Sequence, residues 1–269
     1  KSAGVFNGDY AAVKDKYGDS LIIDREGNVV IENYGLFPIS YVGRESEDGI
    51  FNIGANVPYD QKYVYIDTEG NEAVNSQNVP VTYYGLYSTT LYYELATPFR
   101  NGKAVVMRAT NAALKVKDMG YYSEIAYIID TEGSCVAKLP QGLDADLAGF
   151  DENMLIIVTD GEGLYGLADE EGALVIPVEY DSIAHCEGTA YLVEKDGLYG
   201  FINRKGETVA ECIYEDALPF SEGRAAVYNG DAWGFIDRNG DVVIDFQFDD
   251  VASLNISEYG DGTASGAFS

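Results

Sequence analysis

The sequence predicts an all-β fold of six or seven tandem three-stranded antiparallel β-repeats, each about 34 residues long. Three observations support this prediction. An aromatic-Gly pair recurs at a constant spacing, a polar turn ending in Gly follows each pair, and short apolar segments fill the spaces between turns. Self-similarity at a fixed period is the signature of repeat architectures. The best helical pattern is one short segment, ATNAALKVKDMG at 109–120.

The aromatic-Gly pairs fall on the central strand of each predicted unit. They stand 34 residues apart, at Tyr165-Gly166, Tyr199-Gly200 and Trp233-Gly234. Strand alternation places Trp233 and Phe235 on one face, with Gly234 and Ile236 on the other. Both faces are apolar or small, so we expect each sheet to be covered on both sides. The glycines would let a neighbouring ring or sheet approach closely.

The turn after each pair has a physical reason of its own. It recurs at Asp169–Gly172, Asn203–Gly206 and Asp237–Gly240, with weaker copies at Asp24–Gly27, Asp67–Gly70 and Asp130–Gly133. An Asp or Asn side chain at the first position can accept the backbone N–H two residues on, and Gly at the fourth can adopt the left-handed conformation. Gly172, Gly206 and Gly240 are therefore expected to close hairpins.

The last unit illustrates the predicted strands, which are Arg224–Tyr228, Ala232–Asp237 and Asp241–Asp245. We predict one repeat domain over 1–257, with regular repeats at 150–250 and degenerate repeats with insertions at 1–149, then a Gly/Ser-rich tail at 258–269. Residues 71–125 hold either a decayed repeat or insertions. One unit cannot bury two faces alone, so the units would stack as a propeller-like ring or an open β-superhelix. The chain begins partway through a unit, which slightly favours the ring.

These residues resemble a known family. The pattern aromatic-Gly-Phe-Ile-Asp-x-x-Gly-x-Val-Val-Ile at 233–244, with Pro-Phe-Ser-Glu-Gly-x-Ala-Ala-Val at 219–227, resembles the bacterial WG repeat, also called the KWG repeat. Tyr replaces Trp in the two preceding copies. The resemblance implies a β-repeat scaffold of bacterial origin with no catalytic residues to carry across. It also implies an extracytoplasmic protein, secreted or tethered to the membrane by a preceding segment.

Charge and composition exclude several classes of partner. The formal net charge is −28, and no cluster of Lys and Arg occurs, which argues against nucleic acid and against anionic lipid. No run of 18 apolar residues occurs, so we expect no membrane insertion by this segment. The three cysteines are widely spaced and predict no disulfide framework. We expect no cofactor, and we assume a monomer.

The sequence provides no clear catalytic or metal site. The acidic turns lack the alternate ligands and distal Glu of an EF-hand loop, and the single histidine, His185, excludes zinc sites that need several. His185 occupies the position of Pro219 and Pro98 in other units, which predicts a loop before a strand. Adjacent strand residues point to opposite faces, so His185 and Cys186 are not expected to form a catalytic pair. We predict a structural role for both. A carbohydrate-active hydrolase that uses paired carboxylates is the enzymatic alternative, because 45 acidic residues are present.

A Tyr-rich segment outside the regular rhythm is the candidate binding site. It contains Tyr83, Tyr84, Tyr87, Tyr92 and Tyr93. Insertions in repeat scaffolds often carry binding, and tyrosine suits protein or glycan recognition. The structural alternative is that these tyrosines form amphipathic strands of a degenerate unit. The functional prediction is a non-enzymatic scaffold that binds an unknown protein or glycan at the cell surface or after secretion. A purely structural spacer is the third hypothesis.

Overall fold

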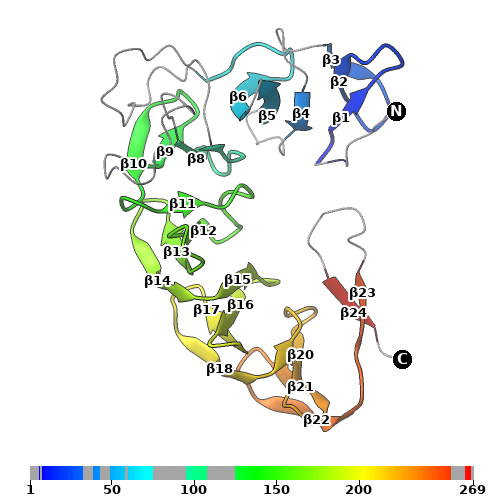
Figure 1. Cartoon of the computed structure of the whole chain (residues 1–269), viewed down its shortest axis with the longest axis vertical. Helices are drawn as coiled ribbons and strands as arrows, with labels where there is room; N and C mark the ends of the chain where they lie inside the picture. The colour runs from blue at the N-terminus through cyan, green and yellow to red at the C-terminus, as the bar shows by residue number, and fades with distance from the viewer. Residues whose placement is uncertain are drawn as a thin grey trace. The chain divides into compact units, whose positions relative to one another are not determined.

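The computed structural model describes residues 6, 8–32, 39–42, 49–57, 60–74, 95–107, 125–255 and 264–267. These residues form antiparallel strands and contain no helix, so none of them belongs to a helix that could cross a membrane (Figure 1). The prediction of an all-β repeat fold is therefore confirmed. By its internal contacts the chain divides into two compact units, Lys1–Ile156 with Ala168–Ala173, and Ile157–Leu167 with Leu174–Ser269.

Four sheets of the described chain contain four strands, each in sequential order. One consists of β7 (Leu95–Ala96), β8 (Lys103–Met107), β9 (Tyr127–Asp130) and β10 (Cys135–Lys138). The next consists of β11 (Asp144–Ala145), β12 (Leu155–Thr159), β13 (Tyr165–Asp169) and β14 (Leu174–Tyr180). The third consists of β15 (Ser182–His185), β16 (Ala190–Lys195), β17 (Leu198–Asn203) and β18 (Thr208–Tyr214). The fourth consists of β19 (Asp216–Ala217), β20 (Arg224–Tyr228), β21 (Trp233–Asp237) and β22 (Val242–Phe248).

The remaining sheets are smaller. The first three-stranded sheet consists of β1 (Ala11–Lys14), β2 (Ser20–Ile23) and β3 (Val29–Glu32). The second consists of β4 (Ile39–Val42), β5 (Ile50–Val57) and β6 (Asp60–Asp67). A two-stranded sheet pairs β23 (Ala252–Asn255) with β24 (Ala264–Ala267), so part of the predicted tail is a strand.

The three strands predicted for each unit are present, and the regular sheets gain a fourth. In the last unit the predicted strands are β20, β21 and β22, and β22 runs three residues further than expected, to Phe248. The extra strand, β19, pairs with β20 through Asp216 and Ala217. Two residues are too few to show the alternation by which a strand is recognised in a sequence, which is why the prediction stopped at three.

The described strands on either side of residues 108–124 belong to one sheet. Strand β8 pairs directly with β9, from Lys103 opposite Asp130 to Val106 opposite Tyr127. The chain between Met107 and Tyr127 therefore connects two neighbouring strands of one sheet. The choice between insertions and a decayed repeat over 71–125 stays a prediction. The helical pattern at 109–120 and the segment 75–94 lie outside the described residues. The single domain over 1–257 and the choice between ring and superhelix stay predictions.

The glycine of the aromatic-Gly pair lies opposite a bulge. Tyr199 pairs with Tyr214 and Phe201 with Ala210, so the single residue Gly200 faces three residues of β18. A Cβ at Gly200 would lie 2.7 Å from the carbonyl oxygen of Ala210 and 2.7 Å from the amide nitrogen of Cys212. The sequence pattern predicted a neighbouring ring or sheet at these glycines. For Gly200 that is wrong, because the bulged strand of the same sheet makes the approach.

Gly166 and Gly234 also lie against the backbone of the outer strand of their own sheet, and at Gly234 an aromatic ring is close as well. A Cβ at Gly166 would meet the backbone of Ile176 and Pro177 in β14. At Gly234, whose flanking residues Trp233 and Phe235 pair with Phe248 and Ile244, it would meet the carbonyl of Ile244 and the ring of Phe246. Here a ring does cover the glycine, as predicted.

The turn residues behave as predicted and also connect successive units. The Asp237 Oδ1 accepts the backbone N–H of Asn239 at 2.8 Å and that of Asp241 at 3.1 Å. Gly240 has a φ of 83°, which only glycine adopts without strain. A Cβ there would overlap the carbonyl oxygen of Val209 in β18, so the turn rests on the outer strand of the preceding sheet.

Both faces of the last regular sheet are buried, as the alternation predicted. Ile236 belongs to a cluster that also contains Phe201 of the preceding sheet, whose ring meets Phe220 edge-on at 4.8 Å. Trp233 and Phe235 belong to a second cluster on the other face, with Ala226.

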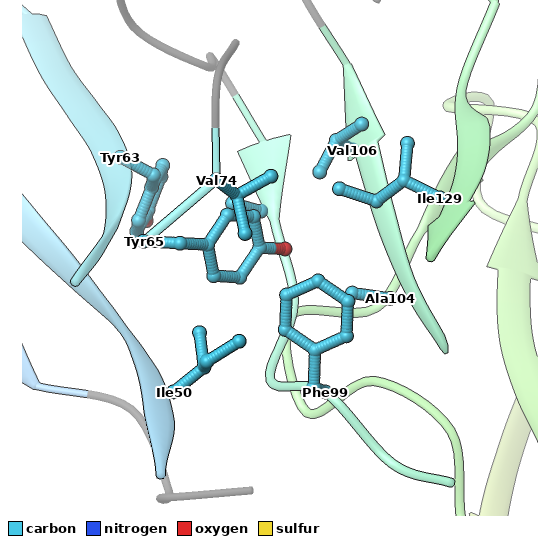
Figure 2. Packing of buried hydrophobic residues seen from close by; sticks show 9 residues of the cluster. Ile50, Tyr63, Tyr65, Val74, Phe99, Ala104, Val106 and Ile129 are labelled. Atoms are coloured by element: carbon cyan, nitrogen blue, oxygen red, sulfur yellow. The ribbon is translucent and has the colours of Figure 1, made fainter. Parts of the chain in front are cut away.

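The first of the two compact units also has an apolar core between its sheets. Figure 2 shows the Tyr65 ring of β6 beside Phe99, with Val106 and Ile129 on neighbouring strands. The two ring centroids are 4.7 Å apart, and the Tyr65 hydroxyl donates to the Thr97 carbonyl at 2.7 Å. Because this hydroxyl is satisfied, the whole tyrosine can be buried without cost to the polar group.

Candidate functional site

The predicted binding tyrosines, Tyr83, Tyr84, Tyr87, Tyr92 and Tyr93, lie outside the described residues. Their role in binding therefore stays a prediction. The repeat-defining residues are placed as structural elements. Tyr165, Tyr199 and Trp233 stand on central strands, Gly200 and Gly234 face bulges, and Gly172, Gly206 and Gly240 close turns with positive φ.

The acidic turns use their carboxylates to order the backbone. Asp67 Oδ1 accepts the N–H groups of Glu69 and Asn71, and Asp130 and Asp169 repeat the pattern. The backbone hydrogen bond from Asn71 lowers the pKa of Asp67, and one from Asn239 lowers that of Asp237. Among the described residues no group of three His, Cys, Asp or Glu side chains could hold a metal ion.

His185 and Cys186 occupy different surroundings. The His185 ring lies 3.2 Å from the Gly188 carbonyl through Nε2 and meets the Tyr191 ring edge-on at 5.3 Å. Cys186 is buried in the core cluster with Phe201, and its burial raises the pKa of the thiol to about 11. A nucleophilic cysteine needs a lowered pKa, so the geometry does not favour a catalytic pair.

A groove lies beside the bulge of β18, in the second of the two compact units. Its volume is about 440 Å³, which is within the range of small-ligand sites. Its lining includes Tyr180 at the end of β14, Lys195 at the end of β16, and Cys212 and Ile213 of the bulge. Leu198, on the same side of β17 as Gly200, adds a further apolar side chain.

The bulge provides part of the wall of the groove. The three residues of β18 that face Gly200 are Glu211, Cys212 and Ile213, and all three line the groove. Ile213 is 62% exposed, although a free apolar side chain of this size usually gains by burial. Because Gly200 has no side chain, β18 can bulge toward it, and the bulge exposes side chains such as Ile213 to solvent.

Charges of both signs surround the groove, with an excess of acid. Lys195 Nζ lies 3.2 Å from Glu179 Oε1 and 5.4 Å from the centre of the Tyr180 ring. The hydrogen bond to Glu179 raises the pKa of Lys195. Asp196 and Glu211 also line the groove. Burial raises the pKa of the Cys212 thiol, and Glu211 adds to the rise, so this thiol is not activated as a nucleophile.

Asp196 and Glu211 are the described carboxylates that the hydrolase hypothesis would use, because both line one groove. A glycosidase acid must keep its proton near neutral pH, which requires burial in an apolar environment. Both residues are exposed to solvent. These two carboxylates therefore lack the apolar burial that such a proton donor requires.

The fold and groove together define a class of protein, an antiparallel β-repeat scaffold with a surface groove. The particular repeat follows from comparison with known families. The family model described as WG containing repeat matches residues 165–199, 199–231 and 233–257. Residues 165–257 therefore consist of WG containing repeats, as the sequence pattern predicted.

Comparison with individual proteins adds little to this family match. No curated protein matches the chain. Among solved structures, BamB from Moraxella catarrhalis is 11% identical, over 94% of this chain and 77% of that one, with a TM-score of 0.44. A protein of unknown function from Bacteroides caccae is 12% identical, over 89% of this chain and 92% of that one, with a TM-score of 0.38. At such scores these likenesses support no inference about function.

Sequence reasoning missed the groove, although a signal was present. Aligning the units at their glycines puts Cys212 at the position of Phe246 in the next unit, since both lie 12 residues after the glycine. A large residue replaced by a small one at a repeated, packed position indicates an unfilled space. That comparison requires knowing that the position is packed, which only the structure provides.

Proposed function

We propose that this protein is a non-catalytic repeat scaffold that binds a protein or glycan partner through the surface of its repeats. The groove beside β18 is the observation that carries the proposal, because it combines a tyrosine ring, exposed apolar side chains and solvated charges. Aromatic and apolar anchors with a polar rim are the usual composition of a recognition surface.

Arrays decide between this proposal and its alternatives. The purified chain would be applied to a glycan array and to a peptide array, and each hit repeated with two variants. One variant changes Tyr83, Tyr84 and Tyr87 to Ala, and the other is Cys212→Phe. If one of the two variants abolishes binding of a hit, the binding surface contains the residues changed in that variant. Absence of binding on both arrays supports the spacer hypothesis instead.

The hydrolase alternative needs its own measurement. Glycans from the array would be incubated with wild type and with a double variant, Asp196→Asn with Glu211→Gln. Cleavage by wild type and its loss in the double variant would overturn the non-catalytic proposal. Binding without cleavage supports it.

We also propose an extracytoplasmic location, at the cell surface or after secretion. The resemblance to the WG repeat family suggested this location, and the high acidic charge is compatible with it. Fractionation of cells that express the complete gene product tests the proposal. Recovery of the protein from the cytoplasm alone would contradict it.

A further inference from the structure

The last regular repeat shows what can fill the groove. Successive glycines, Gly200 and Gly234, align the two units, so Tyr180 corresponds to Tyr214 and Cys212 to Phe246. In the later unit the Phe246 ring stacks on Tyr214, with centroids 6.4 Å apart and an interplanar angle of 28°. In the earlier unit Tyr180 lines the groove, and a thiol takes the place of the ring.

The same two positions differ in what covers the glycine. A Cβ at Gly234 would lie 3.0 Å from the Phe246 ring, so this ring lies directly over the glycine. A Cβ at Gly200 would meet only backbone of β18 as its nearest atoms. The matched pairing of β17 with β18 and of β21 with β22 keeps the backbone frame alike in both units. The groove is therefore lined by Tyr180 and Cys212, the residues that correspond to the stacked pair Tyr214 and Phe246 one repeat later.

The charged residues that line the groove indicate which charge a ligand with an aromatic ring should carry beside that ring. Lys195 is paired with Glu179 at 3.2 Å, which offsets its charge. Asp196 and Glu211 then leave the groove negative, within a chain whose net charge is −28. A ligand with positive charge beside its ring is complementary to this surface.

We infer that the groove between Tyr180 and the β18 bulge binds an aromatic side chain of a partner protein, flanked by lysine or arginine. The partner's ring lies on Tyr180 over Gly200, as Phe246 lies on Tyr214 over Gly234. This inference rests on the proposed binding function and names the class of partner for one site. A glycan ring stacked on Tyr180 is the competing occupant and becomes an outcome of the test.

Protection of Cys212 from alkylation tests occupancy directly. In a Cys135→Ser background, Cys212 is the half-exposed thiol and Cys186 is buried. The probe is the capped heptapeptide Gly-Ser-Lys-Phe-Lys-Ser-Gly, with Phe→Ala and Lys→Glu versions as controls. The phenylalanine peptide should slow alkylation several-fold at saturation, and neither control should do so at the same concentration. Equal rates with the Phe and Ala peptides overturn the inference.

Filling the groove provides the second test. Cys212→Phe reproduces the pair that the next repeat already contains, so this variant should fold and be at least as stable as wild type. Binding of a fluorescein-labelled phenylalanine peptide, followed by anisotropy, should weaken at least tenfold. Glu211→Gln should weaken the Lys-flanked peptide but leave a Ser-flanked one unchanged. Unaltered binding in Cys212→Phe contradicts the inference.

The outcomes separate this inference from the proposed function. If a partner found on the arrays binds Cys212→Phe as well as wild type, the scaffold binds elsewhere and only the groove assignment fails. If oligosaccharides protect Cys212 and the phenylalanine peptide does not, the occupant is a glycan and the inference is wrong. If neither array gives a hit, the proposed function itself fails.

Discussion

The glycine of the aromatic-Gly pair is required for steric reasons and not for an unusual backbone conformation. Gly166, Gly200 and Gly234 have no positive φ, unlike the turn glycines. Their hydrogen faces the bulged outer strand at distances that a methyl group cannot share. The motif therefore encodes a contact inside one sheet, and a bulge lies opposite the glycine in the repeats of Gly200 and Gly234.

Replacement of Gly200 by Ala should destabilise the protein by roughly 2–3 kcal/mol, because β18 must shift to admit the methyl group. Urea unfolding followed by fluorescence of Trp233, the single tryptophan, measures the change. Gly197→Ala is the matched control, since Gly197 has a φ of 75° and nothing within 4 Å of a built Cβ. The control should cost about 1 kcal/mol for backbone strain alone. Equal effects would refute the steric role.

The turn carboxylates should make stability depend on acid. The pKa of Asp237 is lowered in the folded chain, chiefly by the N–H of Asn239, so the folded state binds protons less readily than the unfolded one. Its contribution is then fully present above the unfolded value of 3.8 and is lost as pH falls through the lower folded pKa. Asp237→Asn should remove the part of the pH dependence that comes from Asp237. The turn should be kept, because Asn203 accepts the same two backbone N–H groups in its own turn.

Thermal unfolding between neutral pH and about pH 3 measures the effect. Asp237→Ala should lower the melting temperature by a few degrees at neutral pH, because the N–H groups of Asn239 and Asp241 lose their acceptor. Asp237→Asn should stay near wild type there. An Asn variant as unstable as the Ala variant would show that the charge, and not the hydrogen bonds, orders the turn.

Among the elements, β18 and β22 show how the surface of one repeat can differ from that of the next. Both strands pair alike with the central strand, and both bulge over a glycine. They differ at the top of the bulge, where β22 has a ring that packs into the core cluster and β18 has a thiol. The backbone is set by the motif, and the side chain at this one position decides whether a groove exists.

Phe246→Cys should therefore open a second groove beside Tyr214. In a Cys135→Ser, Cys212→Ser background, the introduced thiol should react with iodoacetamide at a rate similar to that of Cys212 in wild type. Loss of the ring should cost about 1–3 kcal/mol, because Phe246 is only half-buried. An unreactive thiol would show that the neighbouring side chains collapse into the space and that the two positions are not equivalent.

The same elements show what the sequence could predict. Strands β20 and β21 and the turn at Asp237 were predicted within a residue, because alternation and turn chemistry act locally. Strand β19 was missed because two residues are too few to show alternation, and the β18 bulge was missed because it depends on the register with β17. The groove was missed for the same reason. Cys212 looks like an ordinary half-buried cysteine until its place is compared with that of Phe246.

For the whole molecule the dominant feature is a charge of −28, of which the turns use only part. The described ion pairs are exposed or half-exposed, as with Arg25 and Asp9, so they offset little of the repulsion. The fold is held by the apolar clusters between sheets and must overcome this repulsion. A partner with positive charge would relieve it, which agrees with the basic flanks inferred for the groove ligand.

Salt should consequently stabilise the protein. Raising NaCl from about 0.01 M to about 1 M shortens the Debye length from about 30 Å to about 3 Å, which screens repulsion between the acidic side chains. We expect the melting temperature to rise by several degrees, measured by circular dichroism. CaCl₂ at matched ionic strength is the control, because the described residues contain no metal-ligand cluster. A saturable shift at low millimolar calcium would instead reveal a specific cation site, and a fall in melting temperature with NaCl would show that attraction between charges outweighs repulsion.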